Sequence, residues 1–93
     1  MATTGRGLEN AILVVARLYG WRVAHFRPAR TAKGWRTPIQ GDKGFVDFVL
    51  ARQIEGHVGR VLFFEGKAGT GRLSKDQRAW RDVLLGCPGV EWH

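Results

Sequence analysis

Two acidic residues and a lysine stand in apolar segments of the chain, where charged side chains are unfavourable. Asp47 lies within GFVDFVL, and Glu65 and Lys67 end the later segment VLFFEGK. Side chains alternate across a strand, so Glu65 and Lys67 point to one face of a sheet. If the two segments pair in a suitable register, Asp47 joins them there. A domain this small has a small core and little stability to offset the cost of buried charges. We therefore expect these charges to have a function.

This grouping of charges suits the hydrolysis of a phosphodiester. Two carboxylates that lie close together repel unless a cation sits between them. Carboxylate oxygens with an open coordination sphere suit Mg²⁺ or Mn²⁺, which activate water and stabilise the charge of the transition state. We therefore predict Asp47 and Glu65 as metal ligands, with Lys67 to offset charge or position a water. The alternatives are that both acids are structural and that Lys67 is a solvated strand end.

The composition narrows the class of partner. The 93 residues fit one globular domain (residues 1–93), since 44% are hydrophobic and 11% are aromatic. Fifteen Lys and Arg residues against eight Asp and Glu residues give a net charge of +7, the balance of a protein that binds a polyanion. Nucleic acid is the leading candidate. No apolar run is long enough to span a bilayer, so no membrane partner is expected.

Cysteine and histidine usage favours neither a disulfide nor a zinc site. Cys87 is the single cysteine, which excludes an internal disulfide and fits a reducing cytoplasm. His25, His57 and His93 are scattered, without the spacing of zinc ligands.

The elements that must position the charged residues follow from hydrophobic periodicity. LENAILVVARLYG has helical spacing and ends at Gly20. Its predicted docking stripe comprises Leu8, Ala11, Ile12, Val15, Leu18 and Tyr19. Residues 21–26 predict a short strand that Pro28 ends. FVDFVLAR and RVLFFEGK predict an antiparallel hairpin at the centre of a sheet.

The C-terminal part predicts a second helix and one more strand. The helix begins at Ser74, and GCPG ends it before the strand VEWH. The complete order is helix, three strands, helix, strand. A mixed sheet flanked by helices is one of the few arrangements that cover both faces of apolar strands, so we predict an α/β fold of this kind.

Residues 28–44 carry Gly, Pro and basic residues without periodicity, which predicts a long loop. Its basic side chains are expected to contact phosphates and its tryptophan to stack on an unpaired base, with a solvated loop as the alternative. The residues of this loop and its border predicted to bind nucleic acid are Arg27, Arg30, Lys33, Trp35, Arg36 and Lys43. Arg72, just before the predicted second helix, is added to them. The run KAGTGR lacks a Walker ending, which disfavours nucleotide hydrolysis.

GFVDFVL together with FFEGK resembles the core motif of the PD-(D/E)XK nucleases. HFRPARTAKGWRTPIQGDKGFVDFVLAR followed by GRLSKDQRAW resembles the virus-type replication-repair nuclease (VRR-NUC) branch of that superfamily, over nearly the whole chain. The resemblance implies a restriction-endonuclease-like α-β-β-β-α-β core and Mg²⁺- or Mn²⁺-dependent cleavage of DNA. It also implies a stand-alone, dimeric, phage-type protein directed at branched DNA such as Holliday junctions.

The same resemblance implies an active site of five residues. They would be Asp47 and Glu65 as metal ligands, Glu9 as an acid and further metal ligand from the first helix, Lys67 as the catalytic lysine, and Gln77. Glu9 could instead favour the start of the first helix through the helix dipole. Gln77 stands three residues after Ser74, the spacing of a capping box, and both roles are compatible.

The sequence departs from the family pattern at several places. Val46 replaces the usual proline before the first acid. Gly66 occupies a usually apolar position, where it loosens the strand and is expected to leave a gap on the core side. Relatives commonly continue into a further helix beyond the position of His93.

Two classes of function stay open. The first is a metal-dependent endonuclease that cuts structured or branched DNA in the cytoplasm of a bacterial or phage-infected cell. It would act as a homodimer, because a four-way junction has two-fold symmetry and needs two cuts. The second is a non-catalytic basic module that binds nucleic acid, or a subunit of a larger repair or restriction complex.

Overall fold

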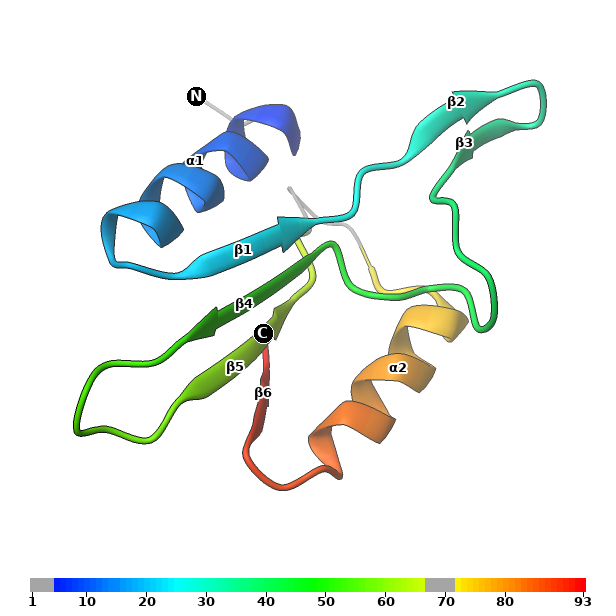
Figure 1. The fold of residues 1–93 in the computed structure, drawn as a ribbon. Coiled ribbons are helices and arrows are strands. Elements are labelled where there is room, and N and C mark those ends of the chain that lie inside the picture. Colours follow the sequence, from blue (N-terminus) through cyan, green and yellow to red (C-terminus); the bar gives the residue numbers. More distant parts are fainter. Residues whose placement is uncertain (1–4, 67–71) are drawn as a thin grey trace.

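The computed structural model describes residues 5–66 and 72–93. They form a small α/β fold with two helices, a four-stranded mixed sheet and a separate two-stranded sheet (Figure 1). The elements are α1 (Gly5–Leu18), β1 (Arg22–His25), β2 (Ala29–Thr31), β3 (Gly34–Arg36), β4 (Phe48–Arg52), β5 (Arg60–Phe64), α2 (Lys75–Leu85) and β6 (Val90–Trp92). The predicted α/β class, with a mixed sheet and flanking helices, is confirmed.

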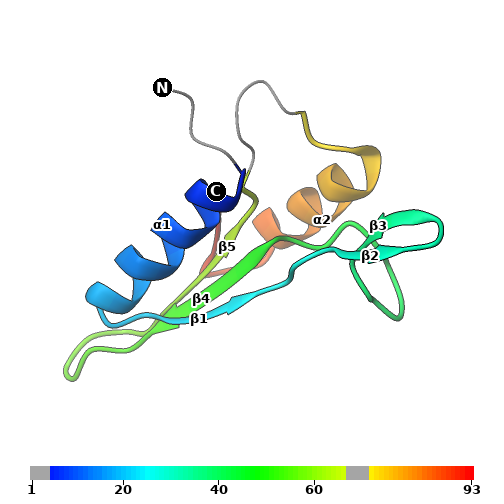
Figure 2. The ribbon, with the colours of Figure 1, turned by 90° about the horizontal axis from the view of Figure 1, so that it is seen from above.

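The four-stranded sheet has the order β1-β4-β5-β6. Strands β4 and β5 pair antiparallel at its centre, with Phe48 opposite Phe64, as the two apolar segments predict. Strand β1 lies antiparallel to β4, and β6 lies parallel to β5 after the crossover through α2. The two helices lie on opposite sides of this sheet (Figure 2).

The core between α1 and the sheet is small. Phe48 is fully buried, and Leu50 and Ala16 are buried beside it. From α1, Ile12 and Leu13 pack against this cluster. The predicted docking stripe of the helix is therefore wrong in part, because its members Ala11, Val15, Leu18 and Tyr19 are exposed. The run AILVVA is apolar on every side, so its periodicity did not define a single face.

The helix α1 ends where the sequence predicts. Gly20 has a φ of 80°, which glycine adopts without strain. Its N–H donates to the carbonyl of Arg17, and the N–H of Trp21 donates to the carbonyl of Ala16 at 2.9 Å. These two bonds form a Schellman motif, which satisfies carbonyls at the helix end and turns the chain into β1.

Residues 28–44 are not an irregular loop throughout, which corrects the sequence prediction. Strands β2 and β3 pair antiparallel and form a hairpin, with Arg30 opposite Trp35. The hydroxyl of Thr31 donates to the carbonyl of Gly34 at 2.8 Å and accepts the N–H of Lys33 at 3.2 Å. These side-chain bonds and the positive φ of Gly34 stabilise a tight turn that hydrophobic periodicity does not reveal.

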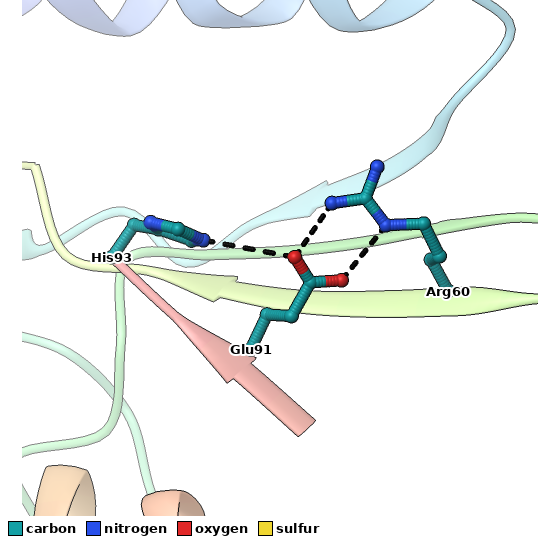
Figure 3. Close-up of polar contacts among 3 residues, drawn as sticks. All are labelled: Arg60, Glu91 and His93. Atoms are coloured by element: carbon teal, nitrogen blue, oxygen red, sulfur yellow. Dashed lines mark hydrogen bonds and ion pairs between the residues drawn. The ribbon is translucent and has the colours of Figure 1, made fainter. Parts of the chain in front are cut away.

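The last strand is fastened to β5 by an ion pair (Figure 3). Arg60 donates two hydrogen bonds to the carboxylate of Glu91, at 2.8 and 2.6 Å, and His93 lies 3.9 Å from the same carboxylate. These hydrogen bonds, helped by the opposite charges, hold the pKa of Glu91 below its usual value and raise the pKa of Arg60. Beyond β6, the N–H of His93 donates to the carbonyl of Phe63 at 2.9 Å. The predicted strand VEWH is confirmed.

Candidate active site at the end of the central hairpin

Asp47 and Glu65 lie at the same end of the two central strands. The last pair in the ladder is Phe48 with Phe64, and one further step in the same register places Asp47 opposite Glu65. The carboxylate of Asp47 accepts the N–H of Gly66 at 3.1 Å. A contact between the two chain segments therefore joins Asp47 directly to the residue after Glu65.

Glu65 is held from two directions. Its carboxylate accepts a hydrogen bond from Nε2 of Gln77 at 2.8 Å, and its N–H donates to the carbonyl of His93 at 2.9 Å. The residue is only 7% exposed. Phe64 packs on the opposite face, against the α1 cluster, so the predicted alternation of these neighbours is confirmed. A buried carboxylate is costly, and the Gln77 bond offsets part of that cost.

Gln77 completes the predicted capping box and also contacts Glu65, while its part in an active site stays a prediction. Its Oε1 accepts the N–H of Ser74 at 2.8 Å while the Ser74 hydroxyl accepts the N–H of Gln77 at 3.1 Å, which completes the capping box of α2. The other end of the same amide binds Glu65. The start of α2 is thus tied to the candidate site through one side chain.

Glu9 lies near a histidine instead of a helix start. The helix dipole acts most strongly in the first turn of a helix. Helix α1 begins at Gly5, so Glu9 lies after that turn. Its carboxylate is 3.5 Å from Nε2 of His25. The His25 side chain is 8% exposed and its ring stacks on Phe48, with centroids 4.2 Å apart. Glu9 is therefore linked to the core face of the sheet through this histidine.

His25 was not singled out by the sequence reasoning, which considered histidines only as zinc ligands. Strand alternation could have revealed it, because Val23 and His25 are two positions apart and share a face of β1. Both are less exposed than their neighbours in the strand. A polar ring on the apolar face of a strand is the feature that the periodicity could have revealed.

Gly66 lacks a side chain at a position that borders the core, as the sequence predicts. A methyl group at this position would meet a carboxylate oxygen of Asp47 and a ring carbon of Phe64 at 3.6 Å, and a ring carbon of Phe48 at 3.7 Å. These are ordinary packing distances. A methyl group therefore fits here without a clash, in contact with Asp47 and the two phenylalanines.

The segment that leads into Asp47 is anchored on α2. Val46 is buried, and the ring of Phe45 packs edge-on against Trp80, with centroids 4.8 Å apart. The indole N–H of Trp80 donates to the carbonyl of Asp42 at 3.2 Å. A Cβ atom on Gly44 would lie 2.5 Å from the Cβ of Asp76, so only glycine fits there. We call residues 42–45 the anchor segment.

The predicted nucleic-acid-binding residues lie on the surface. Those in the hairpin and just before it, Arg27, Arg30, Lys33, Trp35 and Arg36, are exposed. Lys43 is also exposed and lies 3.8 Å from a carboxylate oxygen of Asp76, and Arg72 is exposed before α2. Lys67, the predicted catalytic lysine, lies outside the described residues.

The side chains near Asp47 and Glu65 can be compared with those that a Mg²⁺ or Mn²⁺ site requires. Within residues 5–66 and 72–93, no group of three or more His, Cys, Asp or Glu side chains gathers at metal-binding distance. The structure thus joins Asp47 to the segment of Glu65, but it does not gather Glu9 with them. The carboxylates of Asp47 and Glu65 are hard oxygen donors, the kind that Mg²⁺ and Mn²⁺ prefer.

Compared with known proteins, the chain matches no family model, no curated protein and no solved structure. The resemblance to PD-(D/E)XK nucleases therefore depends on the residues themselves. In the part of the chain that the structure describes, neither helix is long and apolar enough to cross a membrane.

Proposed function

We propose that the chain is a divalent-metal-dependent DNA endonuclease of the PD-(D/E)XK kind, with its active site at Asp47 and Glu65. The observation that carries the proposal is the meeting of two acidic residues at one end of the central hairpin, through the 3.1 Å bond between Asp47 and the N–H of Gly66. A small domain that keeps Glu65 buried in such a place accepts a cost that a structural role alone does not require.

Each residue has a defined task in this proposal. Asp47 and Glu65 hold the ion, and Gln77 fixes the carboxylate of Glu65 at 2.8 Å so that its orientation does not depend on solvent. When bound, Mg²⁺ or Mn²⁺ supplies an activated water and stabilises the charge that develops on the scissile phosphate. Lys67 offsets that charge, as the resemblance implies. The basic residues of the hairpin hold the phosphate backbone.

The test is single-turnover cleavage of plasmid and junction DNA in Mg²⁺ and in Mn²⁺, with EDTA as the blank. Asp47→Asn and Glu65→Gln are expected to reduce cleavage to the rate without metal. DNA affinity in EDTA should hold or rise, because a negative charge next to a polyanion is removed. Asp82→Asn and Glu55→Gln, at exposed acids, are the matched controls and should cut normally. Normal cutting by folded Asp47→Asn would refute the site and favour the non-catalytic binding module.

The active unit in this proposal is a homodimer that presents two sites to a four-way junction. The outer face of α1 supports it: Val14, Val15, Leu18 and Tyr19 are each between 52% and 76% exposed.

Light scattering tests the assembly separately from the chemistry. Leu18→Glu is expected to shift the protein to a monomer, because it places a charge on the uncovered face of α1. Val58→Glu is the control, since Val58 is 91% exposed in the turn between β4 and β5. A wild-type protein that is monomeric both free and on junction DNA would exclude the dimer and leave a simple nicking activity.

A further inference from the structure

The hairpin of β2 and β3 is a separate structural unit, which we call the finger (residues 29–36). Its strands pair only with each other and form a sheet of their own. All three residues of β2 are exposed, as are Trp35 and Arg36 of β3. The finger projects beyond the end of β1, away from α1 and the main sheet (Figures 1 and 2). No packing against the core requires its side chains.

The finger nevertheless presents a large aromatic ring to solvent. Trp35 is 66% exposed, and the guanidinium of Arg30 lies over its ring, 5.9 Å from the centroid. The two residues face each other across the strand pair, so the contact is a product of the register. Lys33 and Arg36 add positive charge on the same unit. An exposed ring among cations is the composition of a surface that stacks nucleobases while holding the backbone.

The base of the finger is at the candidate active site. The chain leaves the main sheet after β1 and returns at Asp47, and the N–H of Phe26 donates to the carbonyl of Asp47 at 2.8 Å. This bond closes the insertion that carries the finger. This insertion therefore starts and ends beside Asp47, one of the two acids of the candidate site.

We infer that the finger binds an unpaired nucleobase on Trp35, so that the protein prefers DNA with single-stranded or unstacked nucleotides. Bases inside a duplex already stack on their neighbours and do not offer a face to the ring. The inference depends on the DNA binding in the proposed function but not on cleavage. It names the substrate class, namely branched or gapped DNA with exposed bases.

Binding in EDTA tests the inference without any chemistry. Fluorescence anisotropy is measured on a labelled single strand, on the matching duplex and on a four-way junction. Trp35→Ala is expected to weaken binding to the single strand by roughly 5- to 150-fold, the effect of losing one stacked base. Duplex affinity should change less than about 2-fold. Trp35→Phe keeps an aromatic face and should restore most of the single-strand affinity.

Two further measurements separate stacking from simple charge. Lys33→Ala removes a cation without removing the ring, so it should weaken binding to single strand and duplex alike. A single strand with abasic sites throughout should bind the wild type and Trp35→Ala equally, because no base is left to stack. Equal losses on single strand and duplex for Trp35→Ala, or no loss on either, would overturn the inference. A protein that binds as expected in EDTA but fails to cut in Mg²⁺ would refute only the nuclease proposal.

Discussion

The insertion between β1 and β4 contains two stretches that are held in opposite ways. The anchor segment packs on α2: the Asp42 carbonyl accepts the indole N–H of Trp80, and Phe45 packs on the same ring. The finger holds itself together by its own strand pair and the hydrogen bonds of Thr31. One insertion thus combines a rigid base, which positions Asp47, with a projecting arm that bears charge and a ring.

This difference predicts a division between stability and binding. Substitutions in the anchor segment should disturb Gln77, Glu65 and the folding free energy together, because these residues share contacts. Substitutions in the finger should leave global unfolding unchanged, since local opening of a self-contained unit does not open the core. Three of the following four predictions examine this division, and the third in order examines an ion pair outside the insertion; they are ordered by their expected effect on the free energy of unfolding.

Gly44→Ala should have the largest effect. Gly44 has a φ of 88°, and a Cβ there would lie 2.5 Å from the Cβ of Asp76 and 2.9 Å from the backbone nitrogen of Gln77. Strain and overpacking together should cost about 3 kcal/mol in urea unfolding. Gly34→Ala is the matched control in the finger, with a φ of 104° and nothing within 4 Å of the new atom. Equal losses for both variants would contradict the division.

The second prediction concerns the double role of Gln77. Ser74→Ala removes only the hydroxyl that caps α2 and should cost about 1 kcal/mol. Gln77→Ala removes the reciprocal cap and also the 2.8 Å bond to Glu65, so it should cost about 1 kcal/mol more. Urea midpoints of the two variants give the comparison. Identical costs would mean that the bond to Glu65 contributes nothing, and that the anchor and the site are not coupled.

The regular elements of the fold follow from the sequence, while the details of the site do not. The strands FVLAR and RVLFF, the stop at Gly20 and the cap at Ser74 each depend on neighbours within a few residues. The finger was missed because its turn is stabilised by Thr31, a side-chain bond without hydrophobic periodicity. The face of α1 was misassigned because its apolar residues surround the helix.

Contacts between distant segments were predicted only where two signals coincided. Gln77 carries both a capping-box spacing and, through the resemblance, a place beside Glu65, and the structure shows a contact for each. Glu9 carries one weak signal, and its contact with His25 depends on how α1 rotates over the sheet. The close approach of Gly44 to Asp76 leaves no trace in the sequence, because the two lie 32 positions apart in different elements.

The third prediction concerns the ion pair between Arg60 and Glu91 of the edge strand β6, for which we expect a small effect on stability. Because Arg60 lowers the folded pKa of Glu91 from its usual 4.5, the pair stabilises the fold above that pH, and this contribution is lost as pH falls through the lowered folded value. Glu91→Gln should therefore lower the urea midpoint slightly at pH 7 and less at pH 3. Glu55→Gln, at an exposed acid, controls for charge alone. A difference from wild type that is the same at both pH values would exclude this ion pair as its source.

Finger substitutions should have the smallest effect on stability while changing DNA binding. Lys33 and Arg36 are exposed and lie on the self-contained hairpin, so the double variant Lys33→Ala with Arg36→Ala should unfold within about 0.5 kcal/mol of wild type. The same variant tests DNA binding. If each side chain neutralises one phosphate, the slope of the logarithm of the DNA-binding constant against the logarithm of the salt concentration should become shallower by about 0.9 per residue. Titrations of duplex DNA in EDTA, at several salt concentrations, measure the slope. Arg17→Ala, on α1 and far along the chain from the finger, should leave the slope unchanged. An unchanged slope in the double variant would show that the finger does not contact the backbone, and a large loss of stability would show that finger and core unfold as one unit.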